Sequence, residues 1–114
     1  EAIDCEDADI VIVAYGISAR AARRATSLAR KAGLRVGLFR PVTLWPFPET
    51  AFRTATKSAG RILVAEMNAG QLRMEIERLT SENQHVEGVN RFDGEPITPE
   101  AILTAIDQSK EQAA

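Results

Sequence analysis

The chain has 114 residues, of which 45% are hydrophobic and 26% charged, as in a single soluble globular domain. Its net charge of −2 argues against a nucleic acid partner, and no apolar stretch approaches the ~20 residues needed to span a bilayer. Its one cysteine excludes an internal disulfide and, with no signal peptide visible, predicts a cytoplasmic location.

Three apolar runs predict the central strands of a parallel sheet, at residues 10–15, 36–40 and 62–66. The first, Ile10-Val11-Ile12-Val13-Ala14, is continuous and β-branched, as in strands that helices cover on both faces. A weaker strand is expected at residues 86–90, where Gly88 lowers the strand propensity. The chain lacks an initiator methionine and its acidic start runs straight into the first strand, so we expect it to be part of a longer protein.

Helical patterns follow the strands. The first begins at Ser18, which suits an N-cap, buries alanines on one face and ends at Gly33. The second is predicted to begin at Pro46 or Pro48 and to end at Gly60, and the later helices are predicted to begin at about Ala69 and at Thr98. Alternating strands and helices need right-handed crossovers. We therefore predict one α/β domain over residues 1–114, a three-layer α/β/α sandwich with a mostly parallel sheet of four to five strands.

Two motifs stand where predicted strands end and helices begin. One is Arg40-Pro41-Val42-Thr43-Leu44-Trp45-Pro46-Phe47-Pro48, and the other is Glu66-Met67-Asn68-Ala69-Gly70-Gln71. Both would leave the carboxyl edge of the sheet, where open α/β sheets place ligands and partner contacts. Aromatic, arginine and amide groups are typical of interface centres, so we predict an interface formed by Arg40, Trp45, Phe47, Glu66, Asn68, Gly70 and Gln71. The same surface would let the isolated domain pair with itself.

The same residues have plainer interpretations. Arg40 would then be a solvent-facing strand end, and Trp45 and Phe47 would fold under their loop as a lid on the core. Asn68 would cap the following helix, and Gly70 would permit close packing. The sequence does not separate these alternatives.

Gly16 and Ser18 are weaker candidates for binding a cofactor or anion at a helix N-terminus. A tight turn followed by a cap is favoured, because the further glycines of a dinucleotide fingerprint are missing. The first helix has a basic outer face that could dock an acidic carrier such as ferredoxin, although a solvated face is favoured; it comprises Arg20, Arg23, Arg24, Arg30 and Lys31. The sequence has no catalytic constellation and no metal-ligand spacing, so we expect neither catalysis nor a metal in this domain.

The order of strand, proline-and-aromatic loop, helix, strand, Glu-x-Asn-x-Gly-Gln and helix resembles the C-terminal, transketolase-like domain of the α subunit of 2-oxoacid:ferredoxin oxidoreductases. The resemblance runs from about Asp9 to the last helix. It implies an enzyme that decarboxylates a 2-oxoacid with thiamine diphosphate and magnesium. It further implies electron transfer through iron–sulfur clusters to ferredoxin and delivery of the acyl group to coenzyme A. In that family the cofactors lie in other domains, so this domain is implied to be structural and to pack against other domains and subunits.

The resemblance also implies five strands in the order 1-3-2-4-5, with the first antiparallel. That first strand is either the acidic stretch 1–7, a poor strand by composition, or is missing from this chain. The near alternatives are the C-terminal domain of the β subunit of a 2-oxoacid dehydrogenase, or that of transketolase. An autonomous small-molecule or nucleotide-binding α/β domain is the alternative of another class.

Overall fold

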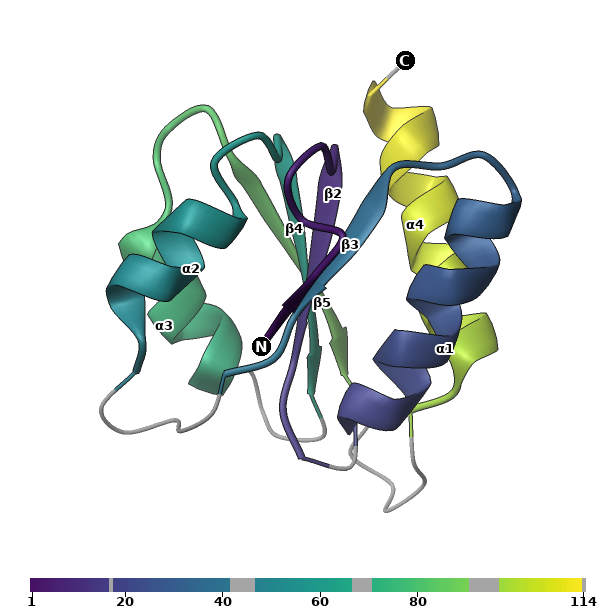
Figure 1. The fold of residues 1–114 in the computed structure, drawn as a ribbon, viewed down its shortest axis with the longest axis horizontal. Helices are drawn as coiled ribbons and strands as arrows, with labels where there is room; N and C mark the ends of the chain where they lie inside the picture. The colour runs from purple at the N-terminus through teal and green to yellow at the C-terminus, as the bar shows by residue number, and fades with distance from the viewer. Residues whose placement is uncertain (17, 42–46, 67–70, 91–96, 114) are drawn as a thin grey trace.

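Strands and helices alternate along the chain, as the apolar runs predict (Figure 1). The computed structural model describes residues 1–16, 18–41, 47–66, 71–90 and 97–113. Its strands are β1 (Ala2–Ile3), β2 (Ile10–Ala14), β3 (Val36–Phe39), β4 (Arg61–Glu66) and β5 (His85–Asn90). Its helices are α1 (Ser18–Lys31), α2 (Glu49–Ala55), α3 (Gln71–Leu79) and α4 (Pro99–Ala113). The three central strands and β5 therefore fall within one residue of their predicted bounds.

The strands form one mixed sheet in the order β1-β3-β2-β4-β5. β2 lies between β3 and β4, and Ile12 is opposite Leu38 on one side and Leu63 on the other. All these pairs and β4–β5 are parallel, whereas β1 is antiparallel to β3. The predicted sandwich and the implied strand order are both confirmed.

The acidic start of the chain does contribute a strand, although composition makes it a poor one. Only its apolar pair, Ala2 and Ile3, forms the ladder with β3. Asp4 then takes a positive φ of 56° and turns the chain across β3. Gly37 makes that crossing possible, because a Cβ there would lie 2.8 Å from the Asp4 carbonyl oxygen and 2.9 Å from the Cys5 Cα. The first strand is thus set by tertiary contact and not by its own propensity.

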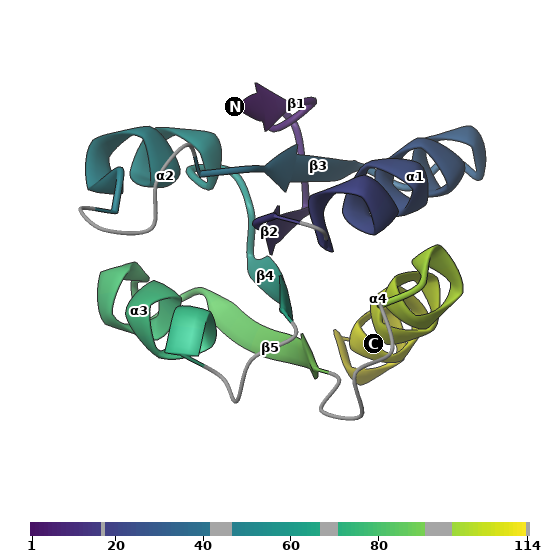
Figure 2. The same cartoon turned by 90° about the horizontal axis from the view of Figure 1, so that it is seen from below.

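Helices cover both faces of the sheet, with α2 and α3 on one side and α1 and α4 on the other (Figure 2). Strand side chains alternate between the two layers, as the pleat requires. Toward α2 and α3, the strands contribute Val11, Val13, Phe39, Ile62, Val64 and Val86 to one core cluster. Toward α1 and α4, they contribute Ile12, Ala14, Val36, Leu38, Leu63 and Ala65 to the other.

The second helix is shorter than the sequence predicts. Pro48 occupies its N-cap position, Glu49 begins it and it ends at Ala55, five residues before Gly60. At the next residue, Thr56, the hydroxyl donates to the Phe52 carbonyl oxygen at 2.9 Å. The Thr56 backbone, with φ −100° and ψ 9°, forms the C-cap at which the helix ends.

Candidate functional site at the carboxyl edge of the sheet

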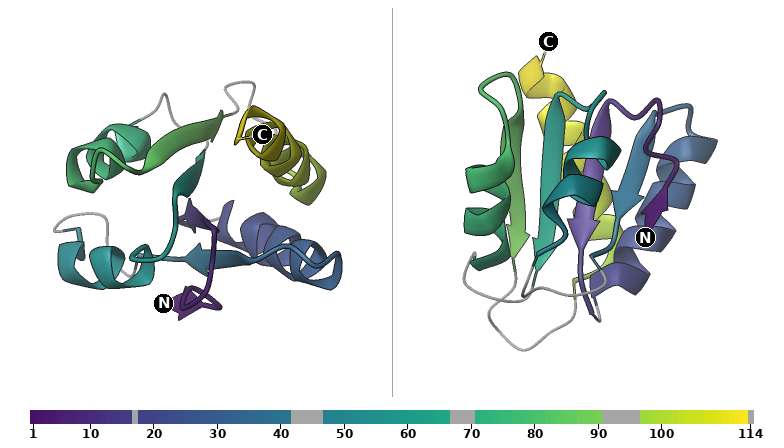
Figure 3. Two further views of the ribbon diagram at one scale, coloured as in Figure 1. Left: turned by 90° about the horizontal axis from the view of Figure 1, so that it is seen from above. Right: turned by 60° about the vertical axis from the view of Figure 1, so that its left-hand side comes forward.

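The carboxyl ends of β2, β3, β4 and β5 lie at one edge of the sheet, because these strands are parallel (right-hand view of Figure 3). Both sequence motifs leave from this edge, after β3 and after β4. Three of the predicted interface residues, Trp45, Asn68 and Gly70, lie outside the described residues. Gln71 begins α3, and its side chain is outside the description as well. The geometry of the edge therefore rests on Gly16, Ser18, Arg40, Phe47 and Glu66.

Glu66 is a buried helix cap. Its side chain is only 4% exposed, and its two carboxylate oxygens accept hydrogen bonds from the backbone N–H groups of Leu72 at 3.1 Å and Arg73 at 2.9 Å. These N–H groups belong to the first turn of α3, which has no intrahelical partners for them. A negative charge at this end also complements the helix dipole. Glu66 thus caps α3, and the capping role that the sequence suggested for Asn68 lies outside the described residues.

Phe47 belongs to the core and not to an exposed aromatic pair. It is 8% exposed, and its ring lies 6.4 Å from that of Phe39 and 5.8 Å from that of Phe52, measured between centroids. Phe39 and Phe52 complete the cluster at 5.7 Å, edge to face. Of the two alternatives left open by the sequence, the structure therefore favours the lid on the core for Phe47.

Gly16 and Ser18 lie at the start of α1. Gly16 has a φ of 65° and its carbonyl oxygen accepts a hydrogen bond from the Ala19 N–H at 3.1 Å, which makes it the turn between β2 and α1. Ser18 is the first residue of the helix and is buried. The tight turn that the sequence favoured is present, and Ser18 lies in the first turn of α1.

Arg40 directly follows β3 and has an exposed side chain. Its backbone is fixed by the first residue: its N–H donates to the Glu1 carbonyl oxygen at 2.7 Å, and its carbonyl oxygen accepts from the Glu1 ammonium at 2.7 Å. Its guanidinium forms no hydrogen bond or ion pair with the described residues. The charge of Arg40 is therefore available at the carboxyl edge.

A hollow of about 270 Å³ joins two of these positions. The strand order places β3 beside β2, so Arg40 reaches the same space as the start of α1. Two arginines of the basic face of α1 enter it as well, which sequence spacing alone does not reveal. The hollow is lined by Gly16, Ala19, Arg20, Arg23 and Arg40. Its lining is strongly cationic.

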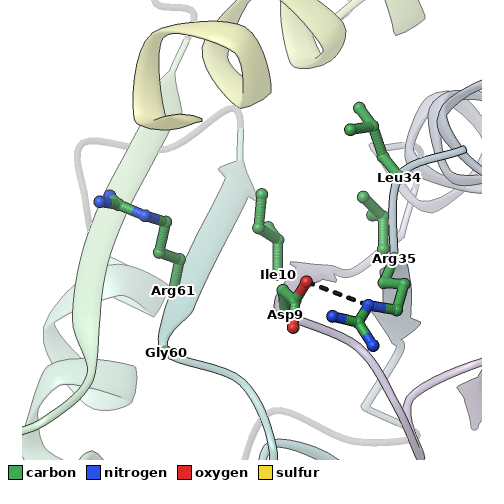
Figure 4. Close-up of a pocket in the computed structure, with 7 residues that line it drawn as sticks. Asp9, Ile10, Leu34, Arg35, Gly60 and Arg61 are labelled. Atoms are coloured by element: carbon green, nitrogen blue, oxygen red, sulfur yellow. Dashed lines mark hydrogen bonds and ion pairs between the residues drawn. The ribbon is translucent and has the colours of Figure 1, made fainter. Parts of the chain in front are cut away.

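A second hollow, of about 500 Å³, lies at the opposite, amino edge of the sheet (Figure 4). Its two arginines are already neutralised, since Arg35 pairs with Asp9 at 3.2 Å and Arg61 pairs with Glu87 at 3.1 Å. Parallel sheets bind ligands at the other edge. It is lined by Asp9, Ile10, Leu34, Arg35, Val36, Gly60 and Arg61.

Cys5 and Asp7 line a third hollow, beside β1 and α2, of about 900 Å³. Burial raises the pKa of the Cys5 thiol, so the neutral and unreactive form is favoured there. The Arg30 guanidinium, 2.8 Å away, lowers the pKa of the Asp7 carboxyl through a hydrogen bond. Among the described residues no group of three or more His, Cys, Asp or Glu could hold a metal ion, and no helix is long and apolar enough to cross a membrane.

The sequence matches the family model of pyruvate:ferredoxin oxidoreductase core domain II over residues 8–102. The chain belongs to this family. As a core domain II, it is 41% identical over 101 residues to the 2-oxoglutarate synthase subunit KorA of Methanothermobacter marburgensis, which covers 89% of this chain and 27% of that subunit. It is 46% identical over 101 residues to the ketoisovalerate oxidoreductase subunit VorB of Methanothermobacter thermautotrophicus, with 89% and 28% covered. The chain thus spans little more than a quarter of the curated relatives that it matches.

Solved structures support the same assignment for this core domain II. The 2-oxoglutarate:ferredoxin oxidoreductase from Magnetococcus marinus, solved with 2-oxoglutarate, coenzyme A and succinyl-CoA bound, superposes with a TM-score of 0.79 at 28% identity. That match covers 90% of this chain and 18% of the oxidoreductase chain. A split-gene transketolase, an inactive β4 tetramer, superposes with a TM-score of 0.74 at 22% identity over 90% of this chain and 39% of its own, which supports the fold alone.

Proposed function

We propose that this core domain II serves the assembly of a 2-oxoacid:ferredoxin oxidoreductase, as part of an α subunit that contacts other domains and subunits. The observation that carries the proposal is the family match over residues 8–102 together with relatives nearly four times longer than the matched segment. A domain that makes up about a quarter of a larger subunit needs surfaces that contact the other domains of that subunit. The described residues of this chain are assigned no step of the reaction.

The whole enzyme would decarboxylate a 2-oxoacid, transfer the acyl group to coenzyme A and pass the electrons to ferredoxin. The names of the relatives support this, as do the 2-oxoacid, coenzyme A and acyl-CoA bound in the Magnetococcus marinus structure. Thiamine diphosphate, magnesium and iron–sulfur clusters would be held by other parts of the enzyme. A cytoplasmic location remains a prediction of the sequence.

The carboxyl edge is the surface that we assign to assembly. Tyr15, which follows β2, is 42% exposed, and Arg40 at the end of the neighbouring β3 is exposed with a free guanidinium among the described residues. Exposed aromatic rings and arginines are enriched at the centres of protein interfaces. Trp45 follows Arg40 and precedes α2 in the sequence, and it would extend the same surface. Phe47 and Glu66 would instead support it from below, as core and helix cap.

Assembly of the full-length α subunit with its partner subunits tests this proposal. Tyr15→Ala, Arg40→Ala and Trp45→Ala should each weaken assembly about tenfold, a typical loss for an interface side chain. The measurement is a pull-down titration of purified partner subunits, with thermal melting of each variant to confirm folding. Arg53→Ala is the matched control, because Arg53 is exposed in the last turn of α2, on the side where the chain returns to the amino end of β4.

Unchanged assembly in all three variants, or an equal loss in Arg53→Ala, would contradict the assignment of this surface. If Trp45→Ala instead unfolds the domain, Trp45 belongs to the core with Phe47. Size-exclusion chromatography of the isolated 114-residue chain adds a second readout. A dimer that Tyr15→Ala dissociates would support the edge as a contact surface, whereas a dimer that persists would place self-association elsewhere.

A further inference from the structure

The hollow at the carboxyl edge has an unusual lining, with three arginines and no acidic residue among its five members. Arg20 and Arg23 come from the first two turns of α1, and Arg40 comes from the end of β3. Arg40 is distant in sequence from the other two, and the pairing of β2 with β3 brings it beside the start of α1. Guanidinium groups that share a small space repel one another unless an anion lies between them.

Two of the three charges have no counterpart in the described part of the chain. Arg23 pairs with the Glu1 carboxylate at 2.6 Å, whereas Arg20 and Arg40 form no side-chain hydrogen bond or ion pair with a described residue. Elsewhere in the described domain five arginines are neutralised by acids: Arg30, Arg35, Arg61, Arg73 and Arg78. The hollow therefore concentrates positive charge that the domain itself leaves uncompensated.

The shape of the hollow favours a small oxyanion. Its volume of about 270 Å³ lies below the ~300–1,000 Å³ typical of pockets for drug-sized ligands. Apart from its chain neighbours, no described residue has an atom within 4 Å of the place where a Cβ of Gly16 would be, so the described residues leave its backbone open to a ligand. The first turn of α1 adds positive partial charge as a secondary contribution. Guanidinium groups match phosphate oxygens in pairs, with two parallel hydrogen bonds.

We propose that the hollow lined by Gly16, Arg20, Arg23 and Arg40 binds a phosphate group. The group would lie between Arg20 and Arg40, with Arg23 shared between the ligand and Glu1. Inorganic phosphate and the phosphate of an ester offer the same chemistry to this site. The proposal stands on the lining of the hollow and shares only Arg40 with the assembly surface, so the effect of Arg20→Gln on phosphate binding separates the two proposals.

Titration of the 114-residue chain with inorganic phosphate, followed by the backbone amide signals of Gly16 and Ala19 in NMR spectra, tests the site. Ionic strength is held constant with sodium chloride, because exposed charges are screened by salt. We expect saturable shifts of these two amides. Arg40→Gln and Arg20→Gln should each raise the dissociation constant about tenfold or more, as loss of a charge-assisted hydrogen bond does.

Arg24→Gln is the matched control. It removes the same charge from the exposed surface of the same helix, next to Arg23 in sequence, and Arg24 does not line the hollow. The dissociation constant of this variant should change by less than about threefold, as expected of a screened exposed charge. Circular dichroism melts of all three variants confirm that they fold.

Shifts that stay linear in phosphate concentration would overturn the proposal. So would unchanged affinity in Arg20→Gln and Arg40→Gln, or an equal loss in Arg24→Gln, which would indicate a diffuse charge effect. A parallel titration with adenosine 5′-monophosphate distinguishes the two sources. Binding as tight as that of phosphate supports an ester as the ligand, and failure of the nucleotide to bind supports inorganic phosphate.

Discussion

On one face of the sheet, α2 and the segment before it pack through the rings of Phe39, Phe47 and Phe52. On the other face, α1 packs through four buried alanines, Ala19, Ala22, Ala25 and Ala29. Both layers belong to one domain and cover neighbouring strands (Figure 2). The aromatic layer fills its space with side-chain bulk, whereas the alanine layer removes the space by bringing the helix close to the strands. Shortening a side chain should therefore destabilise the aromatic layer most, whereas enlarging a side chain should destabilise the alanine layer most.

The largest effect should come from shortening the aromatic layer. Phe52→Ala removes a fully buried ring that contacts both other phenylalanines, and should lower the free energy of unfolding by about 3–5 kcal/mol. Urea denaturation followed by circular dichroism measures the change. Thr54→Ala, exposed on the same helix, should shift the free energy of unfolding by less than about 0.5 kcal/mol. A loss below about 1 kcal/mol for Phe52→Ala would show that the layer collapses easily around the missing ring.

A smaller loss should follow from enlarging the alanine layer. Ala22 is fully buried where α1 faces the sheet, so Ala22→Leu should push the helix away and lower the free energy of unfolding by about 1–3 kcal/mol. Ser27→Leu is the control, because it also introduces a leucine, but on the exposed side of α1. It should change the free energy of unfolding by less than about 0.5 kcal/mol. The same urea titration compares them. Equal stability of Ala22→Leu and the unmodified chain would mean that the close approach of α1 is not under packing constraint.

The smallest loss of stability should come from weakening the Glu66 cap at the carboxyl edge of the sheet. Glu66→Gln keeps one acceptor oxygen for the first turn of α3 but removes the charge, and should lower the free energy of unfolding by about 1–2 kcal/mol. Glu77→Gln, which breaks only the exposed pair with Arg73, should cost about 0–0.5 kcal/mol. Thermal melting of both variants ranks them. If Glu77→Gln lowered the free energy of unfolding as much as Glu66→Gln, the buried cap would stabilise the domain no more than an exposed ion pair does.

The central strands could be predicted from the sequence because burial on both faces leaves continuous apolar runs. The short β1 could not, because Ala2 and Ile3 form a strand only where β3 offers its edge. The end of α2 at Ala55 also escaped prediction. The backbone leaves the helical conformation at Thr56, whereas the apolar spacing and Gly60 indicate a longer helix.

The candidate site was predictable in its parts and not in its arrangement. Gly16 and Arg40 stand out separately in the sequence, but only the order of the strands brings them to one hollow with Arg20 and Arg23. Phe47 shares its loop with Trp45 in sequence, and its burial depends on two rings contributed by β3 and α2. In the sequence Glu66 resembles a polar residue that is available for an interface. Its carboxylate instead accepts hydrogen bonds from Leu72 and Arg73, six and seven residues later, and the sequence does not reveal these bonds.

The crossing of the acidic start over Gly37 has a consequence for solubility. An uncovered outer strand offers a row of free backbone donors and acceptors to any other chain, and proteins limit this risk with very short edge strands and charged residues. β1 pairs for only two residues, and the acidic residues Glu1, Asp4, Glu6 and Asp7 surround it. A shortened form beginning after these residues would leave β3 open to intermolecular strand pairing. β1 and the acidic residues around it thus cover the edge of β3, and Gly37 is the position that lets them lie across it.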